Sequence, residues 1–424
     1  MLMFLLEKHL IWSRSDGNGG TISYYYEERI TWVVLSLAVI WIAWLLIRRY
    51  RLSRAQRRPA NGVSKRMLKQ AIKIKDELSR VYLGAGSSNN LHALGIGRLG
   101  TSDDYCIQFF VNDATRELWP GAGKAALPAS YRGLPLVVVQ MPRASLVIAE
   151  SVNLAALPPS NWPPIRNYVE MTVGGISGAN RNLVGQSGTI GYLFRGKSGR
   201  RRQNVYLLSN AHVFVDLLRT QINNNDLILQ PSPGEMAIRK ESIGGLDAYL
   251  PLKFSGPSQP NFIDAAIGKL NAGQNYQAVL PAIGAVKGYV KRKDVTVGEA
   301  ARKFGRTTGY TEANVFSINM DVWINYSANG QSAFFKNQLL IAPTSQAAPE
   351  FVSGGDSGSL VVDDQCYAIG LICGGRARSQ EDSLTSDSEE QPTTLTDVIT
   401  IGGYGIANPI ENVLNTFALE LLTE

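Results

Sequence analysis

Residues 354–359 read Gly-Gly-Asp-Ser-Gly-Ser and contain the residue types that acyl transfer requires. A serine hydroxyl is a weak nucleophile, so it needs a base to take its proton and N–H groups to stabilise the oxyanion that forms. Glycines before the serine allow those N–H groups to converge. We therefore interpret Ser357 as a candidate nucleophile, against the alternative of a Gly-Ser turn that carries no chemistry.

The base must be one of three histidines, His9, His92 and His212. His9 precedes an apolar segment that we expect to cross a membrane. His92 follows a polar stretch at the start of a different region. His212 comes directly after an aliphatic run, where the end of a strand would present its ring. The sequence thus predicts His212 as the general base.

The third member of such a constellation is a buried carboxylate that orients the imidazole and stabilises its charged form. Asp264 has apolar residues on both sides, in Asn-Phe-Ile-Asp-Ala-Ala-Ile at 261–267. An unpaired carboxylate would be costly there, so it needs a partner. Asp226 also precedes an apolar run, and it stays open as the alternative.

The order His212, Asp264, Ser357 resembles that of the chymotrypsin-like serine proteases, as do Asn-Ala-His at 210–212 and Gly-Asp-Ser-Gly-Ser at 355–359. More narrowly, the chain is similar to bacterial trypsin-like proteins related to the plant Narrow Leaf proteases. Arg-Thr-Thr-Gly at 306–309 and Ala-Asn-Pro-Ile at 407–410 match strings of that group. The resemblance extends over about residues 91–422.

This resemblance implies a chymotrypsin-like double β-barrel, with His212 in the first barrel and Ser357 in the second. It implies an oxyanion hole formed by the backbone N–H groups of Gly355 and Ser357. The expected activity is cleavage of protein or peptide substrates through an acyl-enzyme, with no metal and no cofactor. A peptide-binding scaffold that has lost turnover and an esterase with the same machinery remain as alternatives.

Two details qualify the resemblance. Trypsin-like enzymes place an aspartate six residues before the nucleophile to bind Lys or Arg, and this chain has Phe351 there. We assign Phe351 to the specificity pocket and expect no preference for basic side chains. Thr-Val-Gly-Gly at 172–175 resembles the new N-terminus that pairs, in secreted zymogens, with the aspartate before the serine, here Asp356. Nothing indicates cleavage at that point, so a constitutively folded enzyme is favoured.

The elements that must position these residues are mostly β-strands, because aliphatic residues come in short runs broken by 41 Gly and 19 Pro. Residues 64–82 are an exception, since apolar and charged residues alternate there at helical spacing. Short apolar runs in 91–164 predict a small N-terminal α+β domain, and 165–424 form the protease domain. Residues 409–422 have helical spacing and predict a helix near the end of the chain.

A polar leader, residues 1–29, precedes an uncharged apolar segment at 30–47. At about 1.5 Å per residue this segment spans roughly 27 Å, close to the thickness of a bilayer core. It predicts an N-terminal transmembrane helix and a single-pass membrane protein. Residues 48–90 form a basic juxtamembrane stretch and a helix, and Lys and Arg beside a span are retained in the cytoplasm. We expect the catalytic domain to face the cytoplasm.

The net charge of +7 does not predict nucleic-acid binding, because the basic residues crowd behind the apolar segment instead of lining a groove. Cys106, Cys366 and Cys373 show no spacing typical of a disulfide framework or a zinc site. We expect them to be reduced thiols, in keeping with a cytosolic catalytic domain. The oligomeric state is not predicted.

Overall fold

The computed structural model describes residues 8–15, 21–27, 62–84, 90–99, 104–116, 127–146, 164–217, 222, 226–326, 331–343, 349–377 and 399–422. The chain divides into two compact units, residues 1–65 and 66–424. In the first unit, β1 (Lys8–Ser15) and β2 (Thr21–Glu27) pair as an antiparallel hairpin. No helix within the described residues has the length and apolar character to span a bilayer. The transmembrane helix predicted for 30–47 lies outside them.

In the second unit, seven antiparallel strands form one sheet in the order β25-β10-β11-β14-β13-β12-β8. The strands of this first sheet are β8 (Ala179–Asn180), β10 (Tyr192–Gly196), β11 (Val205–Ser209), β12 (Leu227–Gln230), β13 (Glu241–Tyr249), β14 (Ala266–Leu270) and β25 (Leu419–Leu421). Apolar residues of these strands form one buried core with α5 (Ile410–Phe417). The short strands β7 (Ile176–Ser177) and β9 (Thr189–Ile190) pair separately.

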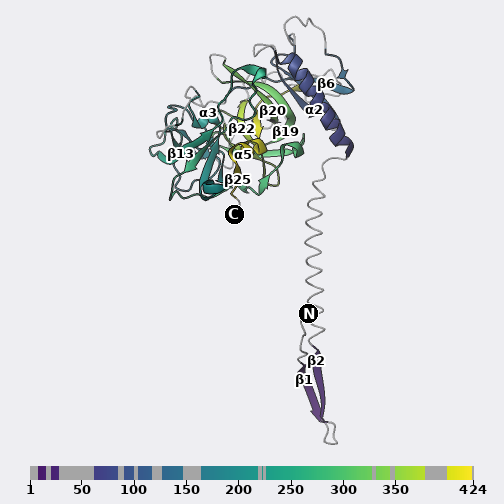
Figure 1. The fold of residues 1–424 in the computed structure, drawn as a ribbon, viewed down its shortest axis with the longest axis vertical. Coiled ribbons are helices and arrows are strands. Elements are labelled where there is room, and N and C mark those ends of the chain that lie inside the picture. The colour runs from purple at the N-terminus through teal and green to yellow at the C-terminus, as the bar shows by residue number, and fades with distance from the viewer. Residues whose placement is uncertain are drawn as a thin grey trace. The chain divides into compact units, whose positions relative to one another are not determined.

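A second sheet contains a closed ring of antiparallel strands, because β18 pairs with both β21 and β19. The ring runs β18-β21-β22-β24-β20-β19 and returns to β18. Its strands are β18 (Ala300–Gly305), β19 (Gly309–Asn325), β20 (Ser332–Ala342), β21 (Leu360–Val362), β22 (Tyr367–Arg376) and β24 (Tyr404–Pro409). The described part of the fold is thus mostly β, as expected (Figure 1). Only the second of the two expected barrels closes through the strand pairs of the described residues.

Residues 91–140 extend the second sheet. Their strands β3 (Leu91–Arg98), β4 (Tyr105–Val111) and β6 (Leu134–Gln140) follow one another outward from β19, and β23 (Ile399–Thr400) pairs with β6. The α+β region expected at 91–164 therefore shares a sheet with the strands that follow the nucleophile loop. Three further strand pairs are short. β5 (Ser130–Tyr131) pairs with β6, and β15 (Val279–Leu280) pairs with β16 (Gly284–Ala285). β17 (Gly288–Tyr289) runs parallel to β22.

The helix predicted for 64–82 is present as α2 (Gly62–Tyr82). Its buried face repeats at helical spacing through Ala71, Ile74, Lys75 and Leu78. The buried ammonium of Lys75 lies 2.8 Å from the carboxylate of Asp321 in β19. This ion pair ties α2 to the ring of strands, since unpaired charges are not tolerated at such depth.

Candidate active site

His212 lies at the point where the first sheet gives way to a short helix. β11 ends at Ser209, and α3 (Ala211–Phe214) begins after Asn210, whose side-chain amide donates to the carbonyl of Asp264 at 2.7 Å. Only 7% of His212 is exposed. The end of β11 thus places the ring of His212 in a largely buried position.

Asp264, one residue before the alanine that precedes β14, is fully buried beside His212. Its Oδ2 lies 2.5 Å from Nδ1 of the imidazole, and its Oδ1 accepts from the backbone N–H groups of Ala211 at 2.8 Å and His212 at 3.4 Å. Such a carboxylate fixes the imidazole tautomer, because Nδ1 then carries the proton and Nε2 is left as the acceptor.

Two residues of the second sheet complete the surroundings of Asp264. Tyr326, directly after β19, donates its hydroxyl to Oδ2 at 2.8 Å, and Asn408 in β24 accepts from the Asp264 backbone N–H at 2.9 Å. Burial, together with the negative charge of Asp264, raises the pKa of Tyr326 well above its ordinary value, so the phenol stays a donor. The carboxylate is therefore satisfied by donors from both sheets.

Ser357 occupies a tight glycine-rich loop between the polar residues 353–356 and β21. Gly355 and Gly358 have φ values of +96° and +92°, a backbone conformation that residues other than glycine rarely adopt. The carbonyl of Ser357 accepts from Thr189 N–H at 2.9 Å, and Gly358 N–H donates to Ile372 in β22 at 2.9 Å. The loop is thus held between β9 and β22 of the second sheet.

The peptide between Gly354 and Gly355 has a defined orientation. The Gly354 carbonyl accepts from the Thr307 hydroxyl and from Arg306 Nη1 at 3.5 Å, and the Gly355 carbonyl accepts from the Thr189 hydroxyl at 2.8 Å. In a trans peptide the N–H points away from the preceding carbonyl, so Gly355 N–H faces away from Thr307. Within the described part of the chain, neither this N–H nor that of Ser357 is used in another hydrogen bond. Both suit the predicted oxyanion hole.

The structure does not join Ser357 to His212 by a hydrogen bond. Among the described residues the Ser357 hydroxyl has no partner, and the residue is 1% exposed. The two segments meet through Thr189, which binds the Ser357 carbonyl and accepts from the Ser209 hydroxyl at 2.7 Å, three residues before His212. Catalytic hydrogen bonds often tighten only when substrate binds.

Asp356 is buried and held from several sides. Its carboxylate accepts from Thr307 N–H at 2.8 Å, from Ser353 N–H at 2.9 Å and from the Thr308 hydroxyl at 2.7 Å. The ammonium of Lys303, in β18, lies 3.3 Å away. Burial lowers the pKa of Lys303, and the Asp356 charge counteracts part of that change. Asp356 therefore has a cationic partner within the chain and needs no new N-terminus.

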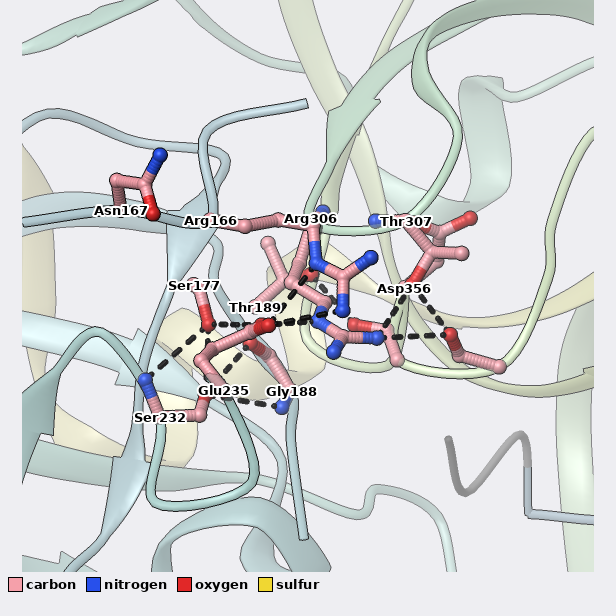
Figure 2. Close-up of polar contacts among 12 residues, drawn as sticks. Arg166, Asn167, Ser177, Gly188, Thr189, Ser232, Glu235, Arg306, Thr307 and Asp356 are labelled. Atoms are coloured by element: carbon pink, nitrogen blue, oxygen red, sulfur yellow. Dashed lines mark hydrogen bonds and ion pairs between the residues drawn. The ribbon is translucent and has the colours of Figure 1, made fainter. Parts of the chain in front are cut away.

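A second buried ion pair supports the same loop, as Figure 2 shows. Glu235 accepts from Arg306 Nε at 2.5 Å, from the Ser177 hydroxyl at 2.8 Å and from Arg166 Nε at 2.9 Å. Burial alone would raise the pKa of Glu235, but the hydrogen bonds and charge of Arg306, with Arg166 and Ser177, hold it below its ordinary value. Arg306 also donates to the Gly354 carbonyl. Glu235 therefore helps to hold the nucleophile loop in place through Arg306.

The other candidate residues lie elsewhere. Asp226 accepts from Asn180 at 3.0 Å and Asn182 at 3.2 Å, whereas the imidazole faces Asp264. His92 in β3 bonds the Met141 carbonyl at 2.7 Å, and burial lowers its pKa to about 3, so it is neutral.

Three further assignments concern His9, Phe351 and the thiols. His9 belongs to β1, in the other compact unit. Phe351 is fully buried, with the Lys303 ammonium 5.6 Å from its ring centre. Its place in the specificity pocket stays a prediction. The three cysteines are free thiols, and the described residues contain no cluster of His, Cys, Asp and Glu that could hold a metal ion.

Several supporting residues were not singled out from the sequence. Tyr326, Thr189, Glu235 and Lys303 each come from segments without a motif, so no signal pointed to them. Arg-Thr-Thr-Gly at 306–309 and the asparagine of 407–410 stand out in the sequence only because they match strings of the Narrow Leaf group. The structure gives these strings a physical meaning, because they bind Asp356, Glu235, the Gly354 carbonyl and the Asp264 backbone.

No family model matches the sequence, and no curated protein matches it either. Solved structures similar to part of the chain include Protease A of Thermobifida fusca, at 17% identity and a TM-score of 0.36, covering 59% of this chain and 98% of that one. A Cellulomonas bogoriensis chymotrypsin has 16% identity and a TM-score of 0.35, with coverage of 59% and 98%. At these values the likeness decides neither the fold nor the activity. The narrower resemblance to the Narrow Leaf group stays a prediction.

Proposed function

We propose that this chain is a serine endopeptidase that cleaves peptide bonds through an acyl-enzyme. The observation that supports this most directly is the 2.5 Å contact between His212 Nδ1 and the buried carboxylate of Asp264. In addition, Ser357 lies on a glycine-rich loop whose backbone is held by β9 and β22. Together these features supply a nucleophile, an oriented base and a stabilised counter-charge.

In the proposed reaction, Nε2 of His212 takes the proton of the Ser357 hydroxyl while its Oγ attacks the substrate carbonyl. The N–H groups of Gly355 and Ser357 stabilise the oxyanion of the tetrahedral intermediate, a contribution typically worth 10²–10³-fold in rate per donor. The imidazolium, stabilised by Asp264, then gives its proton to the leaving amine. Water repeats these steps on the acyl-enzyme and releases Ser357.

Labelling with a fluorophosphonate tests this assignment. The full-length protein in detergent should be labelled, whereas Ser357→Ala and His212→Ala should not. Persistent labelling of the Ser357→Ala variant would refute the assignment of the nucleophile. A comparison of a peptide library with simple esters would then separate an endopeptidase from an esterase.

A peptide-binding scaffold without turnover is the second candidate. The buried Ser357 hydroxyl, which has no hydrogen bond to His212 among the described residues, favours it. A scaffold would bind peptides but would not label in any condition. An intact Asp264–His212 contact is the reason for ranking it second.

We further propose that residues 30–47 anchor the chain as a single-pass membrane protein with the catalytic part in the cytoplasm. The uncharged apolar stretch and the basic residues after it support this orientation. Proteolysis of membrane vesicles of known orientation tests it. The catalytic part should be degraded only in vesicles that expose the cytoplasmic face, and the opposite pattern would contradict the proposal.

A further inference from the structure

The segment at 144–146 forms backbone bridges between two strands beside the proposed active site. Ser145 N–H donates to the Gly375 carbonyl at 3.2 Å, and Gly375 N–H donates to the Ser145 carbonyl at 3.2 Å. On its other side, Leu146 N–H donates to Asn325 at 2.8 Å, and Asn325 N–H donates to Ala144 at 3.1 Å. The segment is therefore inserted between β19 and β22 and held there through its backbone, by isolated bridges at Ser145.

Each of the two strands that hold this segment also leads to a residue near Asp264, Tyr326 after β19 and Cys373 within β22. Asn325 is followed by Tyr326, whose hydroxyl binds Asp264. Gly375 lies two residues after Cys373, whose sulfur accepts from Asn408, the residue that binds the Asp264 backbone. The inserted segment is thus linked, through one strand on each side, to residues that bind Asp264 or its neighbours.

The position of the segment along β22 is also informative. Ile372 uses its N–H and carbonyl to bind Ser359 and Gly358, which directly follow the nucleophile. Gly375 is three residues further along, or about 10 Å at the usual rise of a strand. The nucleophile loop and Ser145 therefore occupy successive positions along β22.

The direction of the segment matches that of a substrate. The bridge between Ser145 and Gly375 is antiparallel, and β22 runs away from the nucleophile loop at this point. Residues 144–146 consequently run toward Ser357. A peptide whose carbonyl is attacked by Ser357 would need upstream residues that approach in this same direction.

The contact does not depend on the side chain of Ser145, which is exposed. Peptides that add a strand to a sheet gain affinity from main-chain hydrogen bonds and can therefore vary in sequence. The edge at Gly374–Gly375 is thus suited to an extended backbone of any sequence.

We infer that residues 144–146 act as a built-in inhibitory strand: they occupy the edge of β22 at Gly374–Gly375, where an extended peptide substrate would otherwise pair. The inference rests on the proposed protease function. Substrate binding then requires the segment to leave β22.

Hydrogen exchange on the full-length protein in detergent tests this displacement. Two reagents that modify the nucleophile are compared, a small alkyl fluorophosphonate and a tripeptidyl diphenyl phosphonate. The peptidyl reagent should make the Ser145 and Leu146 amides exchange faster, by roughly tenfold or more for lost hydrogen bonds of ordinary strength. The alkyl reagent should leave their exchange unchanged.

Proline at position 145 gives a second test, because it removes the N–H that binds Gly375. Ser145→Pro should accelerate inactivation by the peptidyl phosphonate by roughly tenfold, the effect of one hydrogen bond. Ser145→Ala keeps the backbone N–H and is the matched control. The alkyl fluorophosphonate should inactivate all three proteins at equal rates, which also shows that the proline variant is folded.

The outcomes separate the two proposals. If neither reagent modifies Ser357, the protease function fails and the inhibitory strand with it. If both reagents modify Ser357 but exchange at 145–146 is unchanged and Ser145→Pro matches Ser145→Ala, the inhibitory strand alone is refuted. Faster exchange with the peptidyl reagent only, and faster inactivation of Ser145→Pro only, would support it.

Discussion

The hydroxyl of Tyr326 lies 2.8 Å from Oδ2 of Asp264, the same oxygen that faces the imidazole of His212. Tyr326 directly follows β19 of the second sheet, whereas Asp264 shortly precedes β14 and His212 follows β11, both strands of the first sheet. The carboxylate that orients the proposed base is therefore oriented in turn from the opposite half of the molecule. This dependence can be measured.

Replacing Asp264 by Asn should lower kcat by about 10⁴-fold, because the amide stabilises the wrong imidazole tautomer. Steady-state hydrolysis of a peptide substrate would show the loss. Asp226→Asn is the matched control and should retain activity, since Asp226 binds Asn180 and Asn182 away from the imidazole. Equal losses in both variants would contradict the assignment.

Tyr326→Phe should reduce kcat by roughly tenfold, the effect of one hydrogen bond to a charged group, with little change in KM. The phenyl ring keeps the packing against Phe335 and Phe254. Separate measurement of kcat and KM distinguishes this positioning role from a loss of structure. An unchanged kcat would mean that Tyr326 only fills space.

Asp356→Asn should lower kcat by on the order of 10²-fold, comparable with the loss of an oxyanion donor. The amide would place a donor against the Ser353 N–H and the Lys303 ammonium, which both need an acceptor. Asp363→Asn is a suitable control, because its carboxylate accepts from the N–H groups of Gln365 and Tyr367 in a neighbouring turn. If Asp356→Asn remained fully active, the loop would not depend on this carboxylate.

Glu235→Gln should destabilise the fold by about 3–5 kcal/mol, since it leaves the buried Arg306 without its counter-charge. Chemical denaturation measures the free energy of unfolding. Glu241→Gln is the control, because its pair with Arg239 is exposed and should change stability little. Equal stabilities of the two variants would show that the buried pair is dispensable.

The same carboxylate should give a pH dependence of stability. The pKa of Glu235 lies below its ordinary value of 4.5 in the folded chain, so the folded state binds its proton less readily than the unfolded state. Its contribution is complete above pH 4.5 and is lost as pH falls through the lower folded pKa. Thermal unfolding across acid pH should therefore show a steeper decline for wild type than for Glu235→Gln, and parallel curves would argue against it.

Cleavage should show no preference for Lys or Arg before the scissile bond. Phe351 is apolar, and the Lys303 ammonium 5.6 Å from its ring would repel a basic side chain. A positional peptide library checks this expectation. Predominant cleavage after Lys or Arg would place the specificity pocket away from Phe351.

The proposed catalytic residues could be singled out from the sequence because each lies in a short local pattern. Ser357 stands among glycines, His212 ends an aliphatic run, and Asp264 interrupts another. Local patterns also predicted α2, whose buried face repeats at helical spacing. Patterns of this kind can be recognised within a short stretch of sequence.

Long-range partners could not be predicted in this way. Tyr326 and Asp264 are 62 residues apart in the sequence. Ser145 pairs with Gly375 through backbone atoms, so the pairing does not require particular residue types at these positions. The end of the chain shows a related limit. The helix expected at 409–422 ends at Phe417, because Ala418 adopts a left-handed φ of 50° and Leu419–Leu421 pair with β10.

The pairing of Ser145 with Gly375 has a consequence for substrate selection. A strand tethered to the same chain competes at an effective concentration on the order of millimolar, however dilute the protein is. A free peptide at micromolar concentration would rarely displace it, whereas a substrate confined beside the enzyme would reach comparable local concentrations. The local concentration of a substrate beside the enzyme, more than the side chains at its cleavage site, would then decide which proteins are cut.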